Sequence, residues 1–318
     1  MSFQWKTAVG VMVFMAMANV GEAFPAEAPK PVRLPSQQHN RMVCIRVEGK
    51  DDLFVNMPDH YDLGSASISP DGQMIAFDAM TVGEQPVRQS WIVGVDGKGL
   101  RKLADAAVPR WSPDAKRLLV TSNVLPTDSN PWPSQFLIEL ELAGGKERKI
   151  CTGRFGDWSP DGKRIALARG GERTSNSGVY PESTLVVANA DGGEAKELGA
   201  GDWPSWSPDG KKIAYCLSEQ GPPPMLWMVD LETMKRDRLG VGFYRAHWAA
   251  DGKSVVSNGL VLAEDTRPHR MPARFWVDGN RIEFFLLNYD TPFSPSVSRD
   301  GKMVVFIVDS EAQKRPAR

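Results

Sequence analysis

Six polar residues occupy one recurring position in the sequence, and their side chains could together form a binding site. Each stands four residues before an aspartate in a repeated turn: Ser67, Arg110, Asp157, Ser205, His247 and Ser296. Arginine, aspartate and histidine side chains that converge can bind a small anion, a sugar or a metal ion. The simpler interpretation is a hydrated passage with internal ion pairs, such as one between Arg110 and Asp157.

Other polar and aromatic residues lie near this position and extend the candidate binding site: Arg154, Asp202, Trp203, Tyr244 and Arg245. A divalent metal held by Asp157, Asp202 and His247 would favour an enzyme that acts on carbohydrates or lactones. The chain has only 4 histidines, however, and they show no regular metal-ligand spacing. The simpler prediction is that no cofactor is bound, and calcium or another divalent metal is the alternative.

Familiar catalytic motifs are missing from the sequence. It has no His-Glu-x-x-His pair, no Gly-x-Ser-x-Gly turn and no Gly-x-x-x-x-Gly-Lys-Ser/Thr loop. We therefore assign no catalytic residue, and the sequence favours a binding protein over an enzyme.

The turns that define these positions occur six times. Their aspartates follow one another at spacings of 43, 47, 48, 42 and 49 residues: Asp71, Asp114, Asp161, Asp209, Asp251 and Asp300. In a Ser-Pro-Asp-Gly turn, proline presets φ, aspartate accepts from nearby backbone N–H groups, and glycine adopts a positive φ. The six aspartates are therefore predicted to have a structural role, with a ring of calcium sites as the alternative.

Each turn is flanked by the same pattern of short strands, and a large apolar residue, often tryptophan, precedes it. A period in the forties is typical of a four-stranded propeller blade. The sixth repeat ends after two strands, and two matching strands occur near the other end of the chain, at 43–47 and 52–55. The sequence thus predicts an all-β, six-bladed β-propeller, closed by N-terminal strands that complete the last blade. The tryptophans are expected to pack between neighbouring blades.

Two of the turns, at 158–163 and 206–211, read Trp-Ser-Pro-Asp-Gly-Lys. With the strands that follow them, they resemble the WD40-like Pro-Asp repeats of TolB-type β-propellers, over about residues 41–310. The resemblance implies the fold. TolB itself carries an α/β domain before its propeller, and the short stretch 24–40 does not provide one.

The start of the chain is typical of an export signal. Lys6 precedes the apolar run 8–18, and small residues follow it, so residues 1–23 are predicted to be a cleaved signal peptide. The prediction continues with an extended lead-in at 24–40, the propeller at 41–310 and a polar tail at 311–318. We expect a periplasmic or secreted monomer without a membrane span. A formal charge of −1 argues against nucleic acid as a partner.

A second candidate surface lies on the loops between the second and third strands of the blades, at 81–89, 124–134, 170–183, 219–224 and 260–273. These loops differ between blades, and varied loops on a repeated scaffold commonly carry specificity. The residues that we expect to bind there are Trp132, Arg173, Tyr180, Arg267, His269 and Arg270. Together with the first surface, they predict a non-catalytic scaffold in the cell envelope that binds a protein or a small polar ligand. Three cysteines, Cys44, Cys151 and Cys216, are expected to be buried thiols, although one disulfide is the alternative.

Overall fold

The fold is taken from a computed structural model of the chain. The structure describes residues 41–48, 50–55, 57, 60–82, 86–123, 135–170, 183–217, 225–262, 268–279, 281–284, 293–298 and 300–309. Within these ranges the regular structure is entirely β, in 23 strands, and no helix is long and apolar enough to cross a membrane. The predicted signal peptide, the lead-in and the tail fall outside the described residues.

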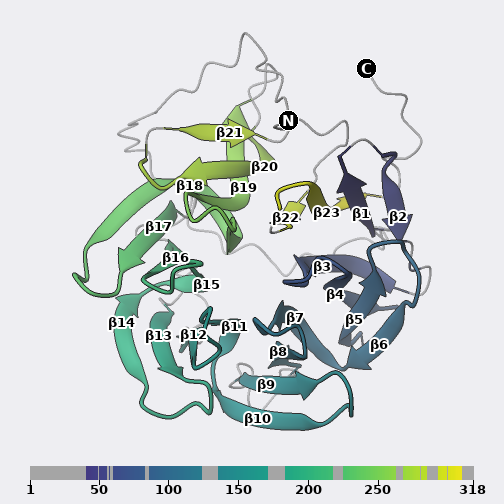
Figure 1. Cartoon of the computed structure of the whole chain (residues 1–318), viewed down its shortest axis with the longest axis horizontal. Coiled ribbons are helices and arrows are strands. Elements are labelled where there is room, and N and C mark those ends of the chain that lie inside the picture. Colours follow the sequence, from purple (N-terminus) through teal and green to yellow (C-terminus); the bar gives the residue numbers. More distant parts are fainter. Residues whose placement is uncertain are drawn as a thin grey trace, which may run out of the picture.

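The strands form six antiparallel blades arranged in a ring around a central axis (Figure 1). Blade 1 contains β3 (His60–Ile68), β4 (Met74–Thr81), β5 (Arg88–Gly94) and β6 (Arg101–Ala104). Blade 2 contains β7 (Ala106–Trp111), β8 (Arg117–Ser122), β9 (Phe136–Glu141) and β10 (Glu147–Thr152). Blade 3 contains β11 (Arg154–Trp158), β12 (Arg164–Arg169), β13 (Thr184–Asn189) and β14 (Lys196–Ala200). In each of these blades the first-named strand lies nearest the axis.

Blades 4 and 5 share one long strand, β18 (Arg236–Trp248). Its first half pairs with β17 as the outer strand of blade 4, and its second half pairs with β19 as the inner strand of blade 5. Blade 4 also contains β15 (Asp202–Trp206), β16 (Lys212–Leu217) and β17 (Met225–Asp230). Blade 5 also contains β19 (Ser254–Leu262), β20 (Pro268–Trp276) and β21 (Ile282–Phe284).

Blade 6 joins the two ends of the chain, as the sequence predicts. Its inner strands are β22 (Phe293–Val297) and β23 (Met303–Asp309), and its outer strands are β1 (Arg41–Val47) and β2 (Leu53–Val55). β1 pairs with β23 along its whole length, from Arg41 opposite Asp309 to Val47 opposite Met303. The ring is therefore closed by hydrogen bonds between segments about 260 residues apart.

The repeated turns owe their shape to the chemistry that the sequence predicts. In the turn of blade 3, the Ser159 hydroxyl donates to Asp161 Oδ1 at 2.6 Å, and the Lys163 N–H donates to the same oxygen at 3.0 Å. The equivalent backbone N–H bond to the aspartate forms in the other five turns. The bond from the serine hydroxyl forms in every turn except that of Asp251. In those five turns the serine bond is the main reason that the pKa of the aspartate is lowered. The structural role predicted for these aspartates is confirmed.

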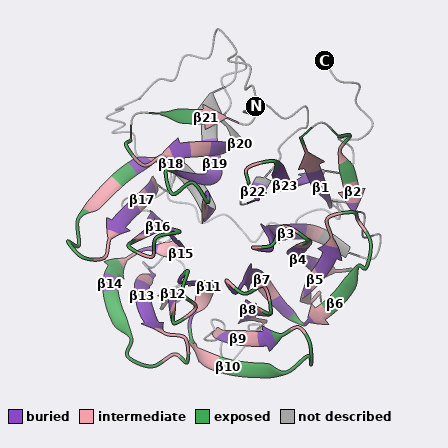
Figure 2. Ribbon diagram, viewed as in Figure 1, coloured by how far each residue is buried: buried purple, intermediate pink, exposed green. Residues whose placement is uncertain are grey.

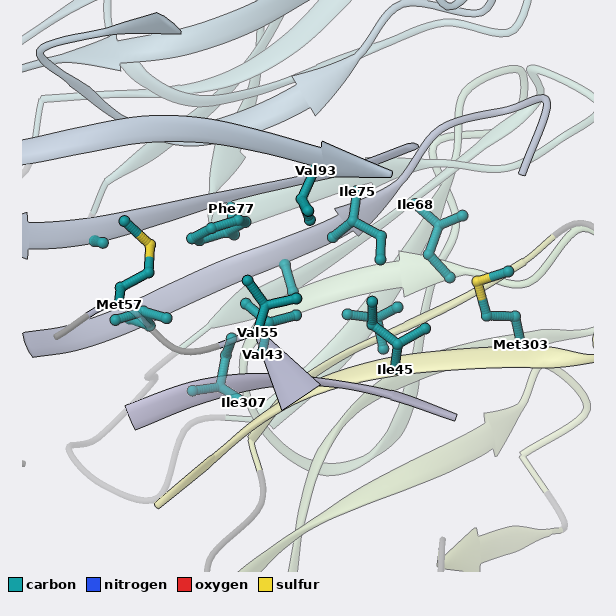
Figure 3. Close-up of a cluster of buried hydrophobic side chains, with 14 residues drawn as sticks. Val43, Ile45, Val55, Met57, Ile68, Ile75, Phe77, Val93, Met303 and Ile307 are labelled. Atoms are coloured by element: carbon teal, nitrogen blue, oxygen red, sulfur yellow. The ribbon is translucent and has the colours of Figure 1, made fainter. Parts of the chain in front are cut away.

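Buried apolar side chains fill the spaces between the blades. Figure 2 shows the buried residues on the inner and middle strands, whereas outer strands such as β10 and β14 are largely exposed. Trp206 of blade 4 is 5% exposed and packs in a cluster with Leu185 of blade 3, as predicted for a residue between blades. Where the ring closes, Val43 and Ile307 of blade 6 pack against Phe77 of blade 1 (Figure 3).

The loops divide between two faces as predicted, with one correction. In blade 3, the turn between the third and fourth strands is hydrogen-bonded to the turn between the first and second strands, because Ala190 N–H donates to Lys163 O at 2.9 Å. The two turns therefore lie on the same face of the ring. The loop expected over 260–273 is shorter, because β19 ends only at Leu262 and β20 already begins at Pro268. The three cysteines are thiols on blades 6, 2 and 4, and two of them, Cys44 and Cys216, are buried.

Candidate functional site

Every inner strand has a β-bulge around one residue with a left-handed backbone. The residue lies six positions before the turn aspartate, and φ is between 51° and 58° at all six: Ser65, Val108, Phe155, Trp203, Arg245 and Ser294. The pairing register shifts at the same place in each blade. A positive φ costs a non-glycine residue about 1 kcal/mol or more, and such strain concentrates at functional sites. We call these six residues the axial ring.

The axial ring is bulky on one side of the axis. The Phe155 and Trp203 rings stack with centroids 3.5 Å apart and planes 13° apart. The Arg245 guanidinium lies 5.3 Å from the centre of the Trp203 ring, and that of Arg154 lies 5.3 Å from the centre of the Phe155 ring. These four side chains, from blades 3, 4 and 5, form what we call the aromatic platform, and all four are half-buried. Three of its members were predicted from sequence as site residues; Phe155 was not.

Arg110 and His247 meet across the axis from opposite blades. Arg110 Nη1 lies 2.6 Å from Nδ1 and 2.5 Å from Nε2 of the imidazole. Because a guanidinium only donates, the imidazole must accept and so be neutral. Burial, with the charges of Arg110 and Arg245, holds the pKa of His247 well below its usual 6.5. The sequence places both residues in the site but does not pair them.

Asp157 connects two blades. Its Oδ2 accepts from the backbone N–H of Trp206 in blade 4 at 2.8 Å, and burial raises its pKa while the nearby Arg110 charge lowers it. The ion pair expected between Arg110 and Asp157 is not formed, because the guanidinium contacts His247 and Asp157 acts on it only through its charge. We call the boundary between two neighbouring blades a seam. The residue four positions before the turn aspartate makes the same contact at two other seams: Ser205 Oγ accepts from Trp248 N–H, and Ser296 Oγ accepts from Ile68 N–H.

Asp202 and Arg154 form an ion pair between blades 4 and 3. Arg154 Nη2 lies 3.3 Å from Asp202 Oδ2, which also accepts from the Ser183 hydroxyl at 3.2 Å. Burial raises the pKa of Asp202, and the Arg154 charge opposes that shift. Among the described residues, no group of three or more His, Cys, Asp or Glu side chains is placed to hold a metal ion. Asp157, Asp202 and His247 all have protein partners in the structure.

A second charged group, which sequence reasoning missed, lies on blade 1. Arg88 donates to Asp62 and, at 3.0 Å, to Asp78 Oδ1. Asp78 is completely buried, and its Oδ2 accepts from the Val108 N–H of blade 2 at 2.8 Å. A signal was present in the sequence, because Asp78 is a charged residue inside the apolar run of a second strand. Asp78 lies seven residues after the turn aspartate. The equivalent residue of blade 2 is Thr121, and its hydroxyl accepts a hydrogen bond from the Phe155 N–H.

The remaining predicted site residues are not tested as a group, because the side chains of these residues are not described. Trp132, Arg173, Tyr180 and Arg267 lie outside the described residues. His269 and Arg270 lie on β20, opposite Val261 and Leu260, rather than in a loop. Tyr244 lies within β18, and its side chain is not described. Binding on the variable loop face therefore stays a prediction.

Comparison with known proteins supports the fold. No protein-family model and no curated protein matches the sequence. Among solved structures, a putative TolB from Agrobacterium tumefaciens is 18% identical with a TM-score of 0.63, over 85% of this chain and 98% of that one. TolB from Acinetobacter baumannii is 16% identical with a TM-score of 0.55, over 87% of this chain and 65% of that one.

An enzyme also shares the architecture. An oligogalacturonate lyase solved with manganese is 14% identical with a TM-score of 0.51, over 81% of this chain and 79% of that one. At such identities the likeness concerns the fold alone, which both binding proteins and enzymes use. The blades, the repeated turns and these neighbours agree with the resemblance found in the sequence. In its fold, the chain is a TolB-like six-bladed β-propeller.

Proposed function

We propose that the chain is an exported, non-catalytic scaffold of the cell envelope that binds a partner protein on the aromatic platform. The observation that carries the proposal is the stack of Phe155 on Trp203 with Arg154 and Arg245 beside it. Aromatic and arginine side chains are the types most enriched in protein interfaces and among their hot spots. Export is supported by the signal-like residues 1–23.

The electrostatics of the site also favour binding over catalysis. Arg154 is paired with Asp202, and Arg88 with both Asp62 and Asp78, so these carboxylates are held in ion pairs. His247 is a neutral acceptor for Arg110. General acid–base catalysis needs a group that can gain and lose a proton near the working pH, and His247 is shifted away from that range.

The test is affinity capture from envelope extracts with the purified chain as bait. Wild type and the control Trp276→Ala, a half-buried tryptophan of blade 5 that lies beside Arg281 and is not part of the platform, should capture the same protein. Trp203→Ala should lose at least nine-tenths of it, because a platform hot spot is removed. Equal capture by Trp203→Ala would place the binding surface elsewhere, and the variable loops would become the next candidates.

The alternative is an enzyme with a metal at the axis, held by Asp157, Asp202 and His247. Elemental analysis of the same purified protein separates the two. Near-stoichiometric calcium, manganese or zinc that is lost in Asp202→Ala would overturn the scaffold proposal. Capture that is unchanged by a chelator, with no retained metal, is the expected result.

A further inference from the structure

The seam between blades 5 and 6 differs from the other seams of the ring. At the other five, a side chain of one blade accepts a backbone N–H of the next: Asp78, Thr121, Asp157, Ser205 and Ser296. The matching residues of blade 5 are His247, which contacts Arg110 instead, and Asn258. Asn258 is 6% exposed, and its Oδ1 has no hydrogen-bond partner in the described part of the chain.

Three members of the axial ring beside this seam also have buried polar atoms without a partner among the described residues: Arg245 Nη1, Ser294 Oγ and Ser65 Oγ. They occupy the same position in the consecutive blades 5, 6 and 1. Ser294 is completely buried and Ser65 is 5% exposed. A buried polar group without a hydrogen bond is destabilising, so this group of atoms needs partners from outside the described residues.

Three of these atoms belong to residues on neighbouring inner strands, β18, β22 and β3. A Cβ atom built on Gly64 of blade 1 would lie 2.8 Å from Arg245 Nη1, so the guanidinium extends from blade 5 to blade 1. β22, which carries Ser294, lies between those two blades and packs against both (Figure 1). Ser65 directly follows Gly64. Gly64 has to be glycine because the guanidinium and Asp78 Oδ1 occupy the space of a side chain.

Among the described residues, no carboxylate forms an ion pair with Arg245. Asp78, whose charge acts on Arg245, gives its two oxygens to Arg88 and Val108 N–H. Burial lowers the pKa of Arg245 to about 10. The negative charges of Asp78 and Asp62 oppose this shift, and the positive charges of Arg88 and Arg110 add to it. At neutral pH the guanidinium of the half-buried Arg245 therefore remains charged, and its buried Nη1 has an available donor.

We propose that Arg245, Ser294, Ser65 and Asn258 bind a small oxyanion at the seam between blades 5 and 6. The guanidinium and the two hydroxyls donate to its oxygens, and the Asn258 amide donates through its nitrogen after rotation or accepts from a protonated oxygen. The anion would provide the contact between blades that side chains provide at the other five seams. This site goes beyond the proposed function, since it needs no partner protein.

The test is titration of the full chain with inorganic phosphate and, separately, with acetate at constant ionic strength, against chloride. Calorimetry should show saturable binding of one of the two oxyanions, and the same oxyanion should raise the Tm, whereas chloride should do neither. A response to phosphate alone indicates a phosphate site, and a response to acetate alone indicates a carboxylate site. Absence of a saturable response to both would overturn the proposal.

Variants locate the site. Arg245→Gln should weaken the anion at least tenfold, and the control Arg281→Gln, an exposed arginine paired with Glu283, should bind as wild type. Ser294→Ala removes a hydroxyl that has no partner without the anion, so it should keep the Tm of the anion-free protein and still weaken binding several-fold. If Ser294→Ala lowers the anion-free Tm and leaves the affinity unchanged, the hydroxyl has a structural role and the assignment is wrong.

Discussion

Residues with a positive φ occur at two recurring positions in this propeller. At the first position, directly after the turn aspartate, five blades have glycine, and glycine adopts a positive φ without steric cost. Blade 2 has Ala115 there, with φ of 57°. At the second position, that of the axial ring, the residue is never glycine, so the strain is retained in all six blades. The turn position can therefore be relaxed by mutation without touching the site.

Ala115→Gly should stabilise the protein by about 1 kcal/mol, because the Cβ strain at positive φ is removed. The matched control is Gly162→Ala at the same position of blade 3, which should destabilise it by a similar amount. A Cβ there would meet only Pro113 Cδ, at 4.0 Å, so the change tests the backbone rather than packing. Urea unfolding measures both, and equal midpoints for the two variants would contradict the explanation.

His247 gives the stability a dependence on pH whose sign follows from its lowered pKa. The unfolded chain takes up a proton near pH 6.5 and the folded chain does not, so stability is full above pH 6.5 and falls as the pH falls below it. Between pH 7 and pH 5 wild type should lose about 2 kcal/mol more than His247→Gln, which accepts from Arg110 without titrating. Parallel stability curves from urea unfolding at each pH would show that His247 takes up its proton in the folded chain at the same pH as in the unfolded chain, which would contradict the lowered pKa.

At the scale of the element, five of the six seams have one side chain that accepts an N–H from the next blade. The inner strands are bulged, so their backbones cannot form a regular ladder with a neighbour, and a side chain satisfies the exposed N–H instead. Asp157 does this for Trp206, whose indole then packs between blades 3 and 4.

Asp157→Ala should cost about 1–3 kcal/mol, because the buried Trp206 N–H loses its acceptor. Asp157→Asn keeps an acceptor oxygen and should cost less, although both variants remove the same charge beside Arg110. The difference between the two in urea unfolding thus isolates the hydrogen bond. If the two variants are equally unstable, the charge is what matters and the hydrogen bond is dispensable.

The elements could be predicted from the sequence and much of the site could not, for one physical reason. Turns such as Ser159–Asp161 are fixed by bonds within five residues, so they are visible in a local pattern. The contact of Arg110 with His247 spans 137 residues and depends on which blades face each other. Local pattern also failed at 260–273, where charged residues suggested a loop but β19 and β20 pair through Val261 and His269.

At the scale of the whole molecule, the ring is a closed cycle of seams, and only one blade contains both ends of the chain. Val43, Ile45 and Val55 of the N-terminal strands supply much of the apolar contact between blades 6 and 1 (Figure 3). Opening that blade would expose this surface and leave the β23 edge unpaired. The stability of the propeller should therefore depend on the β1–β23 pairing more than on any single turn.

A disulfide across that pairing would test it. Glu48 N–H bonds to Lys302 O, so Val47 and Met303 face each other as the next, non-hydrogen-bonded pair, where Cα atoms are about 4.5 Å apart and a disulfide can form. Val47→Cys with Met303→Cys should lose two thiols on oxidation and gain up to about 5 kcal/mol, because the bond closes a very long loop in the unfolded chain. The same protein with a reductant, and wild type with and without it, are the controls in urea unfolding. Thiols that stay unreactive after mild oxidation would mean that the two ends of the chain do not share a blade, since no other arrangement of β1 brings Val47 beside Met303.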